Sequence, residues 1–199
     1  MAGDLKNIKQ IIVLSGKRFC GKDYVGEIMA NEFKKLYNVD AIYAQPSTEI
    51  KKQFAKLRQL DFEKLQNDRN YKEIYRDKMT EFSKEQMEKH GDNYYNRLFV
   101  QNVFANTIVP TIYIVPSRFM FEIELYKLLN IPMTLIRINT KDSVKKNRGW
   151  IYDASIDMDI SEIALDGYRK WDYIFDNNED GYKSILKFIH SLDIIVYQP

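Results

Sequence analysis

The most constraining feature of the sequence is a glycine-bearing segment that joins an apolar run to a helical pattern near the amino terminus. The apolar residues 11–14 end in Ser15 and Gly16, which is typical of a buried parallel strand. From residue 22 to about residue 37, apolar side chains recur at helical spacing and predict an amphipathic helix. A strand, a turn and a helix in immediate succession indicate an α/β protein.

The turn itself has the pattern of a phosphate-binding loop. Residues 16–23 read Gly-Lys-Arg-Phe-Cys-Gly-Lys-Asp and fit G-x-x-x-x-G-K. Glycines let successive backbone N–H groups face one anion, and the following helix presents its positive end to the same anion. An ordinary tight turn would not explain three cations in this segment. We therefore predict that ATP is bound by Gly16, Lys17, Arg18, Phe19, Cys20, Gly21, Lys22 and Asp23.

Two residues of this loop have alternative interpretations. Asp23 stands where Ser or Thr usually ligates Mg²⁺. Its carboxylate could ligate Mg²⁺ directly or through water, or it could instead cap the helix N-terminus. Cys20 is expected to fill space, although a helix N-terminus can lower a thiol pKa and so favour a redox role.

The rest of the chain alternates strands and helices on both sides of a long helical stretch. Further strands are predicted at residues 41–44, 111–115, 133–138 and 173–175, and a closing helix at 182–192. The stretch between has no linker rich in Gly, Pro or Ser, so it is interpreted as an insertion. We predict one α/β domain, residues 1–199, with three layers around a central parallel sheet. Its parts are a core at about 8–46 and 108–199, a helical insertion at about 47–107 and a lid at about 141–160.

The composition excludes several classes of function. Thirty Lys and Arg against 28 Asp and Glu give a net charge of +2, which argues against general binding of nucleic acid polymers or membrane surfaces. One Cys excludes an intramolecular disulfide, and with two His it excludes the usual zinc sites. There is neither a signal-peptide core nor an apolar run of about 18 residues. We expect a soluble, cytoplasmic monomer.

Several charged motifs are spread over almost the whole chain. They are Ser15-Gly16-Lys17-Arg18 with Gly21-Lys22-Asp23, Tyr71-Lys72-Glu73 with Arg76-Asp77-Lys78-Met79, Arg97, Arg137, Arg148-Gly149-Trp150, Ser161-Glu162 with Leu165-Asp166, and Asp172 with Asn177. In this order they resemble the motifs of the animal-type phosphomevalonate kinases, which have a P-loop fold of the nucleoside-monophosphate-kinase type. The combination of G-K-R-x-x-G-K-D with R-G-W is more specific than either motif alone, and Asp in the loop is itself a family feature.

The resemblance implies transfer of the γ-phosphate of ATP, with Mg²⁺, to mevalonate 5-phosphate, giving mevalonate 5-diphosphate. It implies that the insertion binds the acceptor and that the lid contributes an arginine. The implied catalytic residues are Lys22, Arg118 and Arg148. Arg148 and Asn178 are implied as further ATP contacts, and Asp23 as the residue for Mg²⁺. The implied acceptor-binding residues are Lys72, Arg76, Arg97, Arg118, Arg137 and Asn177.

The chain departs from the family pattern after the third main strand. The pattern there has an acidic residue, a small hydroxyl residue and two arginines, whereas this chain has Pro116, Ser117, Arg118 and Phe119. An acidic residue at this position could orient Arg118 or organise Mg²⁺. In its absence, Asp23 or another carboxylate could take over that role. An aromatic side chain in place of an arginine could face a nucleobase, so a deoxynucleoside monophosphate kinase is an alternative. A nucleotide-binding regulator without kinase activity is a second alternative.

An acidic stretch late in the chain also has two interpretations. Asp157, Asp159 and Glu162 could form a metal site, or they could balance nearby lysines and arginines. Glu162 could brace an arginine of the active site.

Overall fold

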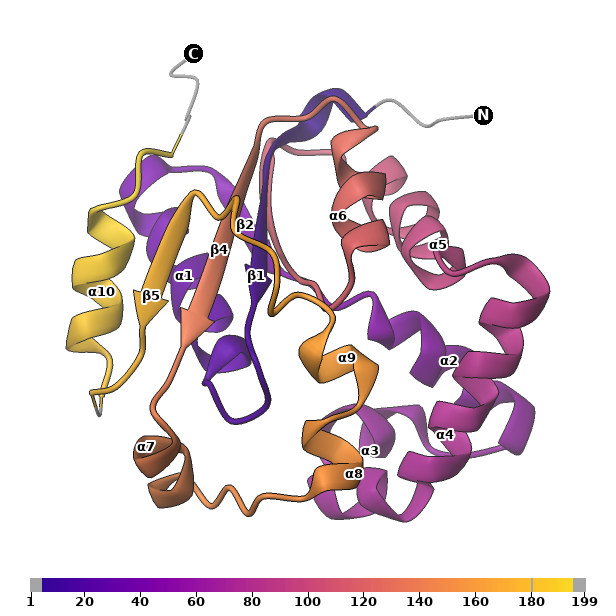
Figure 1. Cartoon of the computed structure of the whole chain (residues 1–199). Helices are drawn as coiled ribbons and strands as arrows, with labels where there is room; N and C mark the ends of the chain where they lie inside the picture. The colour runs from indigo at the N-terminus through magenta and orange to yellow at the C-terminus, as the bar shows by residue number, and fades with distance from the viewer. Residues whose placement is uncertain (1–4, 180, 195–199) are drawn as a thin grey trace. The chain divides into compact units, whose positions relative to one another are not determined.

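The computed structural model describes residues 5–179 and 181–194 (Figure 1). The contacts divide the chain into two compact units. Residues Gln45–Asn106 form the first, which we call the helical unit. The described residues before and after it form the second, which we call the sheet unit.

The sheet unit contains five parallel strands within the described residues, in the order β2-β3-β1-β4-β5. This confirms the predicted α/β class with a parallel sheet. The strands are β1 (Ile8–Ser15), β2 (Asp40–Tyr43), β3 (Thr111–Pro116), β4 (Met133–Asn139) and β5 (Tyr173–Asp176).

The side chains of β1, the central strand, are buried on both faces of this sheet. Ile12 and Leu14 join the core that contains side chains of α1 and α10, while Ile11 and Val13 are also fully buried. Helix α6 covers the face opposite α1 and α10 (Figure 1). The predicted three layers are therefore present. The helices of this unit are η1 (Leu5–Asn7), α1 (Lys22–Tyr37), α6 (Met120–Lys127), α7 (Asp142–Asn147), α8 (Ala154–Asp157), α9 (Ile160–Ile163) and α10 (Lys183–His190).

The helical unit has its own apolar core, in which Phe54, Leu65 and Phe82 pack together. Within the described residues, no helix combines the length and the apolar character needed to cross a membrane. The helices of this unit are α2 (Ser47–Arg58), α3 (Phe62–Asn67), α4 (Arg69–His90), α5 (Tyr94–Asn102) and η2 (Phe104–Asn106).

The parallel sheet places the segments that follow its strands at one edge. The arrowheads of β1, β4 and β5 point in the same direction (Figure 1). Ligands of open α/β sheets bind outside the carboxyl ends of the strands. The loops after β1, β3, β4 and β5 are therefore the places to look for a site.

Candidate functional site

The loop between β1 and α1 has the backbone geometry that a phosphate-binding loop needs. Gly21 has a φ of 82° and Phe19 a φ of 60°, both in the left-handed region. Gly16 also has a steric reason to be glycine. A Cβ there would lie 2.5 Å from Cys20 Sγ and 2.7 Å from the carbonyl oxygen of Ile138. Only a residue without a side chain lets the loop turn so close to β4.

Residues that follow β4 and β5 support this loop. The Asn177 amide donates a 2.9 Å hydrogen bond to the Cys20 carbonyl, to which the Thr140 hydroxyl also donates at 3.1 Å. A Cβ on Gly21 would lie 2.6 Å from Asn177 Nδ2. Asn177 is 2% exposed. The structure thus places Asn177 as a support of the loop, and its implied contact with the acceptor stays a prediction.

Lys22 lies at the start of α1 and is buried, with 8% of its surface exposed. Burial lowers the pKa of its ammonium group, and the positive charge of Arg118 lowers that pKa further. Among the described residues Lys22 Nζ has no ion-pair partner. The structure therefore brings together two of the three predicted catalytic cations, Lys22 and Arg118.

Asp23 does not cap helix α1. The N-cap residue is Gly21, so the interpretation of Asp23 as the cap is wrong, although its carboxylate lies in the first turn, where a negative charge favours the helix. The Asp23 carboxylate instead accepts a 2.5 Å hydrogen bond from the hydroxyl of Tyr43, which ends β2. Tyr43 is placed for this contact because its ring packs on Gly26, where a Cβ would lie 2.4 Å from Tyr43 Cδ2. One carboxylate oxygen of Asp23 is thereby oriented by its neighbour.

Cys20 is buried within the loop, as its predicted role of filling space requires. Burial raises the pKa of its thiol and outweighs the effect of the nearby Lys22 charge. This shift opposes the thiolate that a redox role would need.

The acidic stretch pairs with the cations of the phosphate loop. Asp157 forms a two-pronged ion pair with Arg18, at 2.6 and 2.9 Å. Burial raises the pKa of Asp157, but hydrogen bonds from Arg18, the Asp153 backbone and Trp150 outweigh it and lower the pKa overall. Among the described residues no cluster of three metal-ligating side chains occurs. The interpretation of this stretch as charge balance is therefore favoured.

Two further carboxylates of this stretch form ion pairs with lysine and arginine side chains of the sheet unit. Asp166 bridges Lys17 at 2.7 Å and Arg137 at 2.8 Å. Arg137 also donates to the Ser15 hydroxyl at 3.0 Å, so it connects β4 to the beginning of the loop. Glu162 forms an ion pair with Arg118. The implied contacts of Lys17 and Arg18 with ATP and of Arg137 with the acceptor stay predictions.

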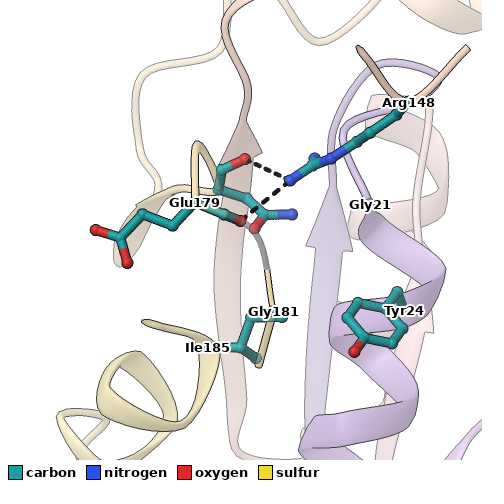
Figure 2. Close-up of a pocket in the computed structure, with 7 residues that line it drawn as sticks. Gly21, Tyr24, Arg148, Glu179, Gly181 and Ile185 are labelled. Carbon is teal, nitrogen blue, oxygen red and sulfur yellow. Dashed lines mark hydrogen bonds between the residues drawn. The ribbon is translucent and has the colours of Figure 1, made fainter. Parts of the chain in front are cut away.

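A pocket of about 220 Å³ lies beside the phosphate loop (Figure 2). Arg148 enters it, and its Nη2 donates to the carbonyls of Asn177 and Glu179. Its Nη1 is buried without a hydrogen-bond partner in the part of the chain that the structure describes. A Cβ on Gly21 would lie 3.5 Å from this Nη1, so the guanidinium lies close to the loop. The lining residues are Gly21, Tyr24, Arg148, Asn177, Glu179, Gly181 and Ile185.

The residues around Arg148 explain how it is held there. Gly149, with a φ of 86°, turns the chain after α7. Trp150 is buried, its indole donates to Asp157 at 3.0 Å, and Lys145 Nζ lies 4.8 Å from its ring centroid. Trp150 therefore packs against the residues that surround it. Asn178, an implied ATP contact, accepts a 2.8 Å hydrogen bond from the backbone of Lys141 before α7; its contact with ATP stays a prediction.

Three implied acceptor-binding residues belong to the helical unit. Lys72 and Arg76 lie one turn apart on α4, and Arg76 pairs with Glu73. That hydrogen bond raises the pKa of Arg76. Arg97 on α5 donates to the His90 carbonyl. Their contact with an acceptor stays a prediction.

The segment that departs from the family pattern is organised by a carboxylate that the sequence analysis missed. Glu122 in the first turn of α6 accepts from the Ser117 hydroxyl at 2.8 Å and from the backbone of Arg118 and Phe119 at 2.6 and 3.1 Å. The Phe119 ring stacks on Phe121, with centroids 4.9 Å apart. An acidic residue in a first helical turn, three to five positions after these donors, was the available signal. Tyr24 and Tyr43 were also missed, and nothing in their local pattern marks them.

A family model and a sequence relative indicate the same family. A family model described as phosphomevalonate kinase matches residues 14–130. A Drosophila melanogaster protein named phosphomevalonate kinase is 29% identical over 174 residues, which cover 86% of this chain and 89% of that protein. A shikimate kinase from Bacteroides thetaiotaomicron is 16% identical, with coverage of 90% of this chain and 94% of the other and a TM-score of 0.47. A shikimate kinase from Aquifex aeolicus is 14% identical, with coverage of 91% and 94% and a TM-score of 0.43. The strand order and the loop after β1 support the assignment of the fold.

Proposed function

The chain belongs to the phosphomevalonate kinase family, and on this premise we propose that it transfers the γ-phosphate of ATP to mevalonate 5-phosphate. Membership in a kinase family implies ATP as the donor and a small phosphate compound as the acceptor. The products are ADP and mevalonate 5-diphosphate. The cytoplasmic location, the monomeric state and the absence of nucleic acid or membrane partners stay predictions.

The observation that carries this proposal is the environment of Lys22. A buried ammonium group with no ion-pair partner among the described residues is costly, and the nearby charge of Arg118 raises that cost. A phosphate group placed between the two cations would offset it. Enzymes that transfer phosphoryl groups work mainly by aligning the reactants and by surrounding the transferring group with cations.

ATP fits the sheet unit in two adjoining places. The backbone of the loop and the start of α1 suit the phosphates, and the pocket beside Gly21 suits the nucleoside. Arg148 lines the pocket, and its buried Nη1, which has no hydrogen-bond partner among the described residues, lies close to Gly21 and can donate to the ligand. Tyr24 and Ile185 supply an aromatic and an apolar wall for a base.

Asp23 is the residue that fits Mg²⁺. Its carboxylate is a hard oxygen donor at the start of α1, and one oxygen is oriented by Tyr43. When bound, Mg²⁺ neutralises charge on the phosphates. Asp23→Ala is expected to raise the Mg²⁺ concentration needed for half-maximal turnover, whereas Tyr43→Phe is expected to raise it less.

The reaction needs no covalent contribution from the protein. An oxygen of the acceptor phosphate forms a bond to the γ-phosphorus of ATP, and the bond from that phosphorus to the β,γ-bridging oxygen breaks. ADP leaves with the bond's electron pair. Lys22, Arg118 and Arg148 stabilise the negative charge on the transferring group.

The helical unit is proposed to bind the acceptor through Lys72, Arg76 and Arg97. These cations lie on α4 and α5, and Arg76 presents a planar group suited to a phosphate or carboxylate. Arg76→Ala is expected to raise the KM for the acceptor about tenfold or more and to leave the KM for ATP nearly unchanged. An equal rise in both constants would contradict this role. Arg58→Ala, at the end of α2, is a matched control.

The decisive experiment is a coupled assay of ADP release with mevalonate 5-phosphate and a panel of nucleoside monophosphates. We expect turnover on mevalonate 5-phosphate, and its loss in Lys22→Met. Turnover on nucleotides alone would instead indicate the monophosphate kinase. ATP binding without ADP release on any acceptor would indicate a nucleotide-binding regulator.

A further inference from the structure

One carboxylate links the phosphate loop to the arginine that follows β3. Glu162 on α9 is almost fully buried, with 7% of its side chain exposed. Its Oε2 accepts a 2.7 Å hydrogen bond from the backbone N–H of Arg18 in the loop. Its Oε1 accepts from Nη1 of Arg118, which also donates to the Ser161 carbonyl at 3.2 Å. The two oxygens of one side chain therefore hold two separate segments of the site.

The charge of Glu162 matters as well as its shape. Arg118 lowers the pKa of Lys22, while Glu162 acts on that pKa in the opposite direction. The carboxylate therefore lies close enough to both cations to offset part of their repulsion. Without it, the Arg118 side chain, which is 36% exposed, could reduce the repulsion by turning toward solvent.

Glu122 does not perform this task. It accepts hydrogen bonds from the backbone of Arg118 and Phe119 and from the Ser117 hydroxyl. It thus fixes the course of the chain after β3 and leaves the guanidinium group to Glu162. This division matters because Pro116, at the end of β3, stands where the family pattern has an acidic residue.

We propose that Glu162 is a positioning residue, which holds the Arg118 guanidinium against the phosphate loop so that the transferring phosphoryl group is received between Arg118 and Lys22. This inference rests on the proposed kinase function. It gives Glu162 no contact with substrate. In Glu162→Gln the amide oxygen can still accept from the Arg18 N–H, so the effect on turnover passes through Arg118.

The test is a double-mutant cycle with Glu162→Gln and Arg118→Ala. Gln has nearly the same shape, but its amide nitrogen must face one of the two donors that the carboxylate accepts from. We expect Glu162→Gln to lower kcat about 10- to 100-fold with the KM for ATP within about threefold. We expect the double variant to match Arg118→Ala within about threefold, because Glu162 acts through that side chain. The control is Glu32→Gln. Glu32 lies near the far end of α1 and is hydrogen-bonded to His190 of α10, and this variant should keep wild-type kcat.

Several outcomes would overturn the inference without touching the proposed function. One is a wild-type kcat in Glu162→Gln together with a lowered kcat in Arg118→Ala. Another is a kcat of the double variant that is reduced by the product of the two single reductions. If Glu162→Gln does not fold, Glu162→Asp carries the test. It keeps the charge but is too short to span both donors, and wild-type kcat in it would overturn the inference. Wild-type kcat in Arg118→Ala, or no turnover of mevalonate 5-phosphate by the wild type, would instead contradict the proposed function.

Discussion

The side-chain amide of Asn177 donates a 2.9 Å hydrogen bond to the backbone carbonyl of Cys20, although 157 positions separate the two residues in the sequence. The contact joins the segment after β5 to the phosphate loop. It leaves the loop carbonyl paired inside the protein, where an unpaired carbonyl would cost about 1–3 kcal/mol.

We expect Asn177→Ala to lower the Tm by about 2–10 °C and to raise the KM for ATP about tenfold. The Thr140 hydroxyl lies 3.1 Å from the same carbonyl and can donate to it in the variant, so the fold should survive. Asn177→Asp should be worse, because its carboxylate faces the carbonyl oxygen without a proton to donate. Thermal unfolding followed by circular dichroism and initial rates would measure both effects, with exposed Asn67→Ala as the control. A rise in the KM for the acceptor alone would instead support a direct substrate contact.

Lys22→Met is expected to lower kcat at least about 100-fold and to raise the Tm at pH 7. The variant keeps the side-chain stem and removes a charge that burial disfavours. The folded state lowers the pKa of Lys22, so the penalty is full below the folded pKa and disappears as the pH rises above the unfolded value. The difference in Tm between variant and wild type should therefore shrink from pH 7 to pH 10. A variant less stable than the wild type at pH 7 would contradict this.

Gly16→Ala should destabilise the protein and impair ATP binding, because its Cβ would approach Cys20 Sγ to 2.5 Å and the Ile138 carbonyl to 2.7 Å. The carbonyl belongs to β4 and cannot move aside cheaply. We expect a Tm lower by several degrees and an increase of about tenfold or more in the KM for ATP. Gly167→Ala is the matched control, since a Cβ there has no neighbour within 4 Å among the described residues. Equal behaviour of the two variants would show that the loop tolerates the added carbon.

Cys20 is expected to react slowly with iodoacetamide at pH 8 in the native protein and rapidly after unfolding in guanidinium chloride. Burial blocks access and raises the pKa of the thiol, so little thiolate forms. Mass spectrometry over time would follow the labelling. Cys20→Ala should keep kcat within about threefold. Rapid native labelling, or a large loss of kcat, would revive a redox or catalytic role for the thiol.

Much of the fold could be predicted because it depends on local patterns. The helix from Lys22 to Tyr37 has the bounds that its apolar spacing predicts, and the loop before it follows from two glycines and their spacing. The predicted strands are all present, although β1 begins three residues earlier than the apolar run suggests. In its first three residues buried and half-buried side chains alternate, and Lys9 and Gln10 are polar, so a search for continuous apolar runs misses them.

The sequence by itself determined the class of fold, the phosphate loop and the cations that surround it, because strand and helix periodicity and loop chemistry are written in neighbouring residues. Only the tertiary structure decided how these cations are held. Glu162 reaches Arg18 across 144 positions and Arg118 across 44, and Asp166 reaches Arg137 across 29. Such pairs depend on which strand ends come together at the edge of the sheet. No local pattern records that, and so the same acidic stretch could be taken for a metal site until the fold showed Asp157 and Glu162 paired with arginines and Asp159 capping α9.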